Sequence, residues 1–150
     1  MQKQVAGPTQ PNPNLNASLD TLNKSIQRMT DSLIQEPFVA LNLNVATSVN
    51  QAANTVIGQG VPVPVGYKLV LQDDNFVSVT SGGSVSLVIM DYNGKNIVNT
   101  ITSNISSSAS GFGGTVIEQT NCAAVIVNTQ GAGTVTSYLS GYLKKMVNYQ

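Results

Sequence analysis

The chain has 150 residues, enough for one ordinary domain and a tail but not for two large domains. Only 9% of the residues are charged, and seven basic residues balance seven acidic ones. Outside Lys144 and Lys145 no basic patch could neutralise phosphates, so we expect no nucleic-acid binding. Asn, Ser, Thr and Gln supply 55 residues, and such an uncharged surface does not oppose self-association.

The sequence also argues against a membrane protein and against a disulfide framework. No stretch approaches the roughly 18 apolar residues of a membrane span, and the start lacks the apolar segment of a secretion signal. The single cysteine, Cys122, lies in the apolar run CAAVIV, which favours a buried core residue over a reactive thiol. A chain without disulfides is typical of assembly in a reducing compartment, such as a bacterial cytoplasm.

Residues 1–14 form the first predicted segment, an extended arm. Pro8, Pro11 and Pro13 lie there among Gln, Asn and Thr residues. Proline fixes φ and biases the preceding residue toward extended backbone, so this arm should have no fold of its own. It is either disordered or laid along a partner.

An unbroken heptad pattern of apolar residues follows the arm. The spacings are 4, 3, 4, 3 and 4, which predicts an amphipathic helix with one apolar seam. The seam consists of Leu15, Leu19, Leu22, Ile26, Met29 and Leu33. We expect a helical stalk in residues 15–37, with Asn14 as the N-cap, a helix running from about Leu15 to Gln35, and Pro37 closing the segment.

Such a helix is marginal alone in water, so its seam must be buried against something. One interpretation packs the helix on the chain's own β domain. The other is a short parallel coiled coil with copies of the same chain, in which the seam is the oligomerisation surface. The flanking e and g positions favour a trimer over a dimer within the second interpretation, because their side chains are small and uncharged. These positions are Asn16, Asn23 and Thr30 at e, and Ser18, Ser25 and Ser32 at g.

Residues 38–65 are expected to form a connecting segment that ends in a hinge. Residues 38–60 fit either a strand or a continued helical seam, and their β-branched and Asn content favours a strand first, with a helical turn later. Pro62 and Pro64 in the run VPVPV require extended backbone that cannot be a central strand.

Residues 66–150 read as an antiparallel β-sandwich or jelly roll. Short alternating or apolar runs are divided by turn signals, and no helical crossover lies between them. Asn93 and Gly94 predict a hairpin with a type I′ turn, and residues 106–114 a flexible loop. The expected strands are 67–72, 76–80, 84–91, 96–102, 115–119, 122–128 and 134–143.

The residues that carry chemistry are few, so we expect no enzyme and no cofactor. The chain has no histidine, which removes the commonest general base and metal ligand. A glycosidase needs two acids that face each other across a cleft, and Asp91 with Glu118 is the candidate pair. Both residues fit ordinary solvated strand ends and turns. Asp73-Asp74-Asn75 and Asp91-x-Asn93 offer oxygen ligands for calcium, but neither completes a loop motif, and we expect plain turns without metal.

In its architecture the chain resembles the small fibre and decoration proteins of tailed phages. The resemblance rests on the arm MQKQVAGPTQPNPN, the heptad segment LNASLDTLNKSIQRMTDSL, the hinge VPVPV and the β region from YKLVLQ to SYLSGYL. It covers the whole chain but carries no residue motif. It implies a virion structural protein, a capsid decoration or head-fibre subunit that is assembled in the host cytoplasm. Residues 1–37 would attach it to other virion proteins, and a trimeric shaft would carry an outward β knob.

A carbohydrate-binding or adhesin module is the alternative function. Sugar sites commonly use exposed aromatic faces, and the chain has no Trp. Tyr138 and Tyr142 lie four residues apart and therefore share one face of a predicted strand. A glycan on a host surface would be the ligand.

Overall fold

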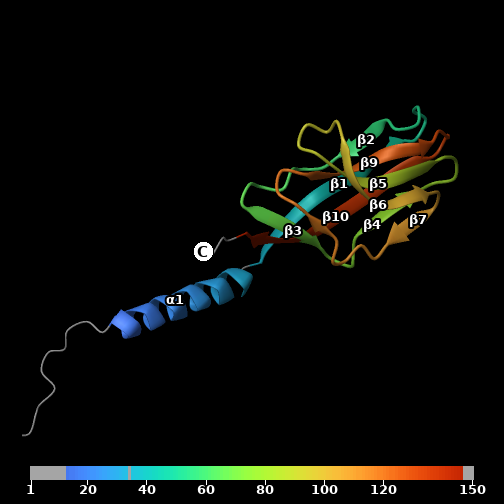
Figure 1. Cartoon of the computed structure of the whole chain (residues 1–150). Helices are drawn as coiled ribbons and strands as arrows, with labels where there is room; N and C mark the ends of the chain where they lie inside the picture. Colours follow the sequence, from blue (N-terminus) through green and yellow to red (C-terminus); the bar gives the residue numbers. More distant parts are fainter. Residues whose placement is uncertain (1–12, 34, 147–150) are drawn as a thin grey trace, which may run out of the picture. The chain divides into compact units, whose positions relative to one another are not determined.

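The computed structural model describes residues 13–33 and 35–146 (Figure 1). The described residues divide into two units, residues 13–33 and residues 35–146. The first is one helix and the second holds the strands, so the part of the chain that the structure describes is mainly β with a single helix. Residues 1–12 of the predicted arm lie outside the described residues.

Helix α1 spans Pro13–Leu33 and contains the whole heptad seam. It begins at Pro13, whose fixed φ suits the first turn of a helix. The expected N-cap, Asn14, therefore lies inside the helix, where its carbonyl accepts a hydrogen bond from Ser18 Oγ at 2.9 Å. Gln35 is not helical, so the expected helix end at that residue is two residues too late.

Residues 35–146 fold into two antiparallel sheets. In the larger sheet the order is β7-β4-β10-β3-β8, with β1 on the other side of β10, and in the smaller it is β2-β9-β5-β6. The strands are β1 Glu36–Ser48, β2 Val56–Gln59, β3 Tyr67–Leu71, β4 Phe76–Val79, β5 Ser84–Met90, β6 Ile97–Ile105, β7 Ser108–Ser110, β8 Val116–Ile117, β9 Cys122–Thr129 and β10 Thr134–Lys145.

Strand β10 organises the larger sheet. Its first half pairs with β4 and its second half with β3, while β1 runs along its opposite edge. Alternation along β10 separates two faces, because Val135, Leu139 and Leu143 are buried whereas Tyr138 and Tyr142 are partly exposed. The buried side chains belong to a core to which both sheets contribute.

The smaller sheet buries side chains on both of its faces, which explains the continuous apolar runs of β5 and β9. Val85, Leu87 and Ile89 of β5 join the core shared by the two sheets. On the opposite face a second apolar cluster consists of Val88, Met90, Cys122, Ala124 and Ile126. The prediction of a buried Cys122 is confirmed by its zero exposure.

The segment 38–65, expected as a connection and hinge, is part of the β unit. It supplies β1 to the larger sheet, which confirms the strand expected first in residues 38–60, and β2 to the smaller sheet. The helical turn expected later in residues 38–60 is absent there. The run VPVPV is not a strand, but it is held in place rather than hinged. Val63 is buried, its N–H donates to Asn121 O at 2.9 Å, and its carbonyl accepts from Thr120 N at 2.7 Å.

The seven strands expected after residue 66 all occur, with two local corrections. β7 lies inside the expected flexible loop, where it pairs with β4. The turn between β5 and β6 is not type I′, because that turn needs positive φ at both central residues and only Gly94 has it, at 64°. Instead, Asp91 N bonds to Asn96 O at 3.0 Å and closes a six-residue loop.

Candidate functional site

The heptad seam presents apolar side chains to solvent in the isolated chain. Five of its members are about half exposed, and the side chain of the sixth, Leu33, lies outside the described part. The exposed fractions are 56% for Leu15, 49% for Leu19, 54% for Leu22, 50% for Ile26 and 64% for Met29. A contiguous apolar stripe of this kind marks an interaction surface rather than a stable solvent-facing side.

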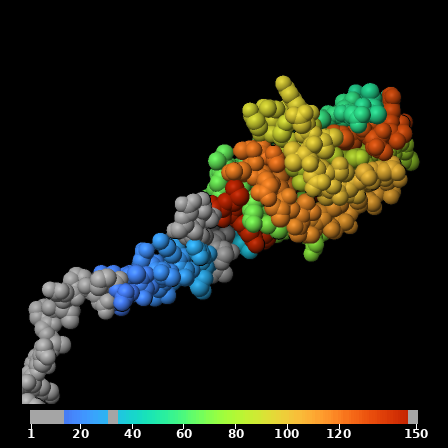
Figure 2. All heavy atoms as spheres, in the orientation of Figure 1, coloured from blue at the N-terminus to red at the C-terminus, as the bar shows by residue number. Residues whose placement is uncertain are grey.

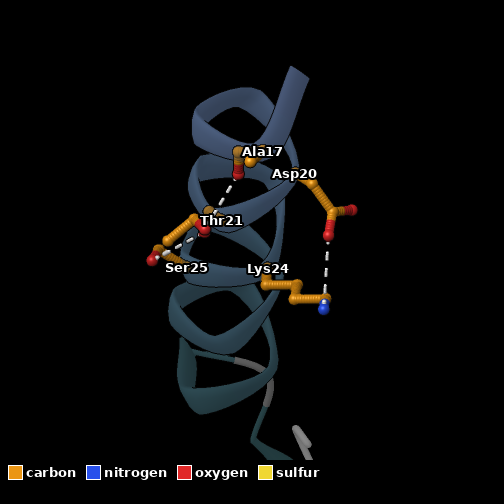
Figure 3. Close-up of polar contacts among 5 residues, drawn as sticks. All are labelled: Ala17, Asp20, Thr21, Lys24 and Ser25. Carbon is orange, nitrogen blue, oxygen red and sulfur yellow. Dashed lines mark hydrogen bonds and ion pairs between the residues drawn. The ribbon is translucent and has the colours of Figure 1, made fainter. Parts of the chain in front are cut away.

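The charged pair of the helix lies away from the seam. Asp20 and Lys24 form an i, i+4 ion pair with Nζ and Oδ2 3.3 Å apart (Figure 3). They occupy heptad positions b and f, opposite the a and d positions of the seam. The helix is therefore amphipathic, with its polar side already paired.

Hydroxyl side chains of α1 bond to the helix itself, both at Ser25 and Thr30 beside the seam and at Thr21 on the far side. Thr21 Oγ1 donates to Ala17 O at 3.0 Å, and Ser25 Oγ donates to Thr21 O at 3.0 Å (Figure 3). Thr30 Oγ1 donates to Ile26 O at 2.9 Å in the same way. Each hydroxyl proton thus has an acceptor within the helix, so covering these side chains would leave no donor unsatisfied.

The outer face of the larger sheet is the second exposed feature. We use this name for the side of β10, β3, β4 and β8 that points away from the shared core. Tyr138 lies directly opposite Phe76 of β4, and Tyr142 opposite Val70 of β3. Phe76 is 41% exposed. The prediction that the two tyrosines share one strand face is confirmed. The sequence did not predict that Phe76 lies beside them, because the register between two strands cannot be derived from either strand alone.

Hydrogen bonds and burial perturb the ionisation of Asp91 and Cys122. The carboxylate of Asp91 accepts hydrogen bonds from Asn96 Nδ2 at 2.7 Å and from Lys95 N at 3.0 Å, which hold its pKa below the usual value. Burial raises the pKa of the Cys122 thiol, which stays un-ionised and donates to Asp91 O at 3.8 Å. These groups brace the loop between β5 and β6.

The two turns that offer oxygen ligands, Asp73-Asp74-Asn75 and Asp91-x-Asn93, use side chains of Asn75 and Asp91 for hydrogen bonds within the fold. Within residues 13–33 and 35–146, no three His, Cys, Asp or Glu side chains lie close enough together to hold a metal ion. Asn75 of the Asp73-Asp74-Asn75 turn is fully buried, and both of its amide atoms bond to Ser140 of β10. Its role is therefore to fasten the turn to the sheet.

Comparison with known proteins yields no relative. No protein-family model, curated protein or solved structure matches the chain. None of the helices that the structure describes is long and apolar enough to span a membrane. Function is therefore inferred from the seam, the outer face and the composition alone.

Proposed function

We propose that the chain is a structural protein of a virus particle, a capsid decoration or head-fibre subunit. Three copies join through a parallel coiled coil of α1, and each carries its two sheets as a β-sandwich that projects from the particle. The protein is assembled in the host cytoplasm and acts in the virion. In this role the chain catalyses no reaction and needs no cofactor.

The observation that carries this proposal is the half-exposed seam on α1. Fully burying a Leu, Ile or Met side chain is worth about 1.5–3 kcal/mol, so the exposed halves offer roughly 1 kcal/mol each on association. Second copies of the same helix suit this surface, because an unbroken heptad spacing is what a coiled-coil partner requires. Packing of α1 on the sheets of its own chain would also bury the seam, but it would not require apolar residues to alternate regularly at spacings of 4 and 3.

The flanks of the seam favour three helices over two. Ser18, Ser25 and Thr30 occupy g and e positions and bond to the backbone of their own helix. The interface of three helices is wider than that of two and can cover these side chains without leaving a hydrogen-bond donor unsatisfied. The e and g positions carry no charges that would specify a dimer. The low content of charged residues, 9%, further permits close association of identical chains.

Attachment to the particle is assigned to residues 1–37. The proline-bearing segment before α1 suits a peptide laid along another virion protein, since its backbone is biased to extended conformations. A particle-binding assay tests this assignment, with a variant lacking residues 1–12 so that α1 stays whole. Loss of the variant from particles is expected, and full retention would contradict the attachment role.

The oligomeric state provides the direct test of assembly. Light scattering coupled to size-exclusion chromatography at micromolar concentration should give three times the mass of one 15.7 kDa chain. A monomer at that concentration would contradict the coiled coil. A dimer would retain the seam as the interface but contradict the trimer.

A further inference from the structure

The outer face of the larger sheet combines aromatic rings with small polar side chains in register. Tyr138 and Tyr142 project from the same face of β10, and their Cα atoms are about 13 Å apart at the usual rise per residue. Phe76 lies opposite Tyr138, and its row continues to Ser110 of β7. The Tyr138–Phe76 pair and the single ring of Tyr142 therefore lie farther apart than one sugar ring is wide.

Polar groups lie between Tyr138 and Tyr142 and also beside Tyr138. Ser140 is midway between the tyrosines on β10, and its Oγ bonds to Gln72 Oε1 at 3.2 Å. Asn42 of β1 flanks Tyr138 on the side opposite Phe76 and is exposed. Rings that supply flat apolar surface, with amides and hydroxyls beside them, match the alternating apolar faces and hydroxyl edges of a sugar chain.

Two lysines end the outer face next to Tyr142. Lys68 of β3 and Lys144 of β10 are direct cross-strand partners, both half-buried. Like charges directly opposite one another destabilise a sheet. Within residues 35–146 neither lysine forms an ion pair. An anionic group seated between them would offset this repulsion, and a carboxylate on a sugar ring carries the required charge.

We infer that the outer face of the larger sheet binds a polysaccharide chain that carries carboxylates. The tyrosines and Phe76 stack on its sugar rings, and Lys68 with Lys144 holds one carboxylate. A nucleic acid fits less well, because the chain has no net charge and a phosphate backbone needs a longer track of cations. The inference concerns residues 35–146 and is independent of the seam on α1.

Binding of defined acidic oligosaccharides to the full chain tests the inference. The probes are hexamers of galacturonic acid, hyaluronan and polysialic acid, each paired with the same sugar neutralised by esterification. Binding is measured by calorimetry and by tyrosine fluorescence, which Trp does not obscure because the chain has none. At least one acid hexamer should bind more tightly than its ester, and the absence of binding by all three would overturn the inference.

Variants separate the two halves of the site. Tyr138→Ala and Tyr142→Ala should each weaken binding of the acid and of the ester by about tenfold. Lys68→Gln with Lys144→Gln should weaken only the acid form, again by about tenfold, because the ester has no charge to lose. Tyr142→Phe keeps the ring, so its affinity should be unchanged, and thermal unfolding of Tyr142→Ala shows whether that variant is folded. Affinities unaffected by all of these changes would overturn the assignment.

Matched controls come from the loop between β5 and β6, which protrudes from the β domain (yellow in Figure 2). Tyr92 there is 64% exposed, and Lys95 lies in the same loop. Tyr92→Ala and Lys95→Gln should leave every affinity unchanged. Equal binding of a single-stranded oligothymidylate through Lys68 and Lys144 would identify a general polyanion surface and overturn the inference. Binding seen only after removal of residues 147–150 would do so too, since the chain's own end would then occupy the face.

Discussion

Asn75 acts as a strand partner for Ser140 through its side chain. Ser140 N donates to Asn75 Oδ1 at 2.8 Å, and Asn75 Nδ2 donates to Ser140 O at 2.8 Å. The pair sits where β10 changes neighbours, after its last pairing with β4 at Tyr138 and before its first pairing with β3 at Gly141. The amide thus supplies an acceptor for Ser140 N–H and a second donor to Ser140 O, which also accepts from Gln72 N at 3.0 Å.

Replacing Asn75 by Ala should lower the free energy of unfolding by about 2–4 kcal/mol, since it strands the buried N–H of Ser140 and leaves a cavity. Asn75→Asp should be nearly as damaging, because a carboxylate keeps the acceptor but cannot donate to Ser140 O. Urea unfolding measures both. Asn42→Ala, at an exposed position of β1, is the control and should change stability by less than about 0.5 kcal/mol.

The loop between β5 and β6 should loosen in acid. Hydrogen bonds from Asn96 and Lys95 lower the pKa of Asp91 in the folded chain. A depressed folded pKa contributes stability that is complete above the unfolded value, about 3.9, and is lost as pH falls through the folded value. The protection of the Lys95 and Asn96 backbone amides, measured by NMR as exchange relative to the intrinsic rate at each pH, should fall over that acid range. In Asp91→Asn the same amides should show no such pH step, and an identical step in the variant would contradict the role of Asp91.

Cys122 should resist thiol reagents in the native protein. Its side chain is fully buried, and burial raises its pKa, so little thiolate is present at neutral pH. A chromogenic disulfide reagent should react with no thiol in buffer and with one thiol per chain in denaturant. Cys122→Ser should lower stability by about 1–3 kcal/mol, because it places a more polar hydroxyl in the cluster of Val88, Met90 and Ala124. Rapid native reaction would show that this cluster opens readily.

Local pattern predicted most strands after residue 66, because alternation along β10 and the apolar run of β5 each identify a strand on their own. It also favoured a strand at the start of residues 38–65, where β1 lies, but it missed that this segment belongs to the β unit, because pairing with β10 is not a local property. The hydrogen-bonded residues Asn75 and Ser140 are 65 residues apart, and no local pattern near Asn75 predicts this contact. The seam could be predicted because heptad spacing is a local property of the sequence. The surface that covers the seam could not be predicted, because it lies elsewhere in the chain or on another molecule.

The seam is tested by placing a charge at its centre. Leu22→Asp with Ile26→Asp removes two half-exposed apolar side chains and would bury a charge in any coiled coil. Losing about 1 kcal/mol of apolar burial at each position, before any penalty for the charges, already weakens association by more than tenfold per chain. Light scattering should therefore show monomers at concentrations where the parent chain is assembled. Thermal unfolding followed by tyrosine fluorescence should leave the β unit intact, because residues 35–146 contain their own core.

Lys24→Ala provides the matched control for this double variant. It lies on the opposite side of α1 and loses only the exposed ion pair with Asp20, worth about 0.3–0.5 kcal/mol in a helix. Its oligomeric state should equal that of the parent chain. If the double variant stays assembled, the copies associate through the sheets and the seam has another occupant. If the parent chain is itself monomeric and the double variant lowers the unfolding temperature of the β unit, the seam packs on the sheets of its own chain, because no loss of assembly then accounts for the change.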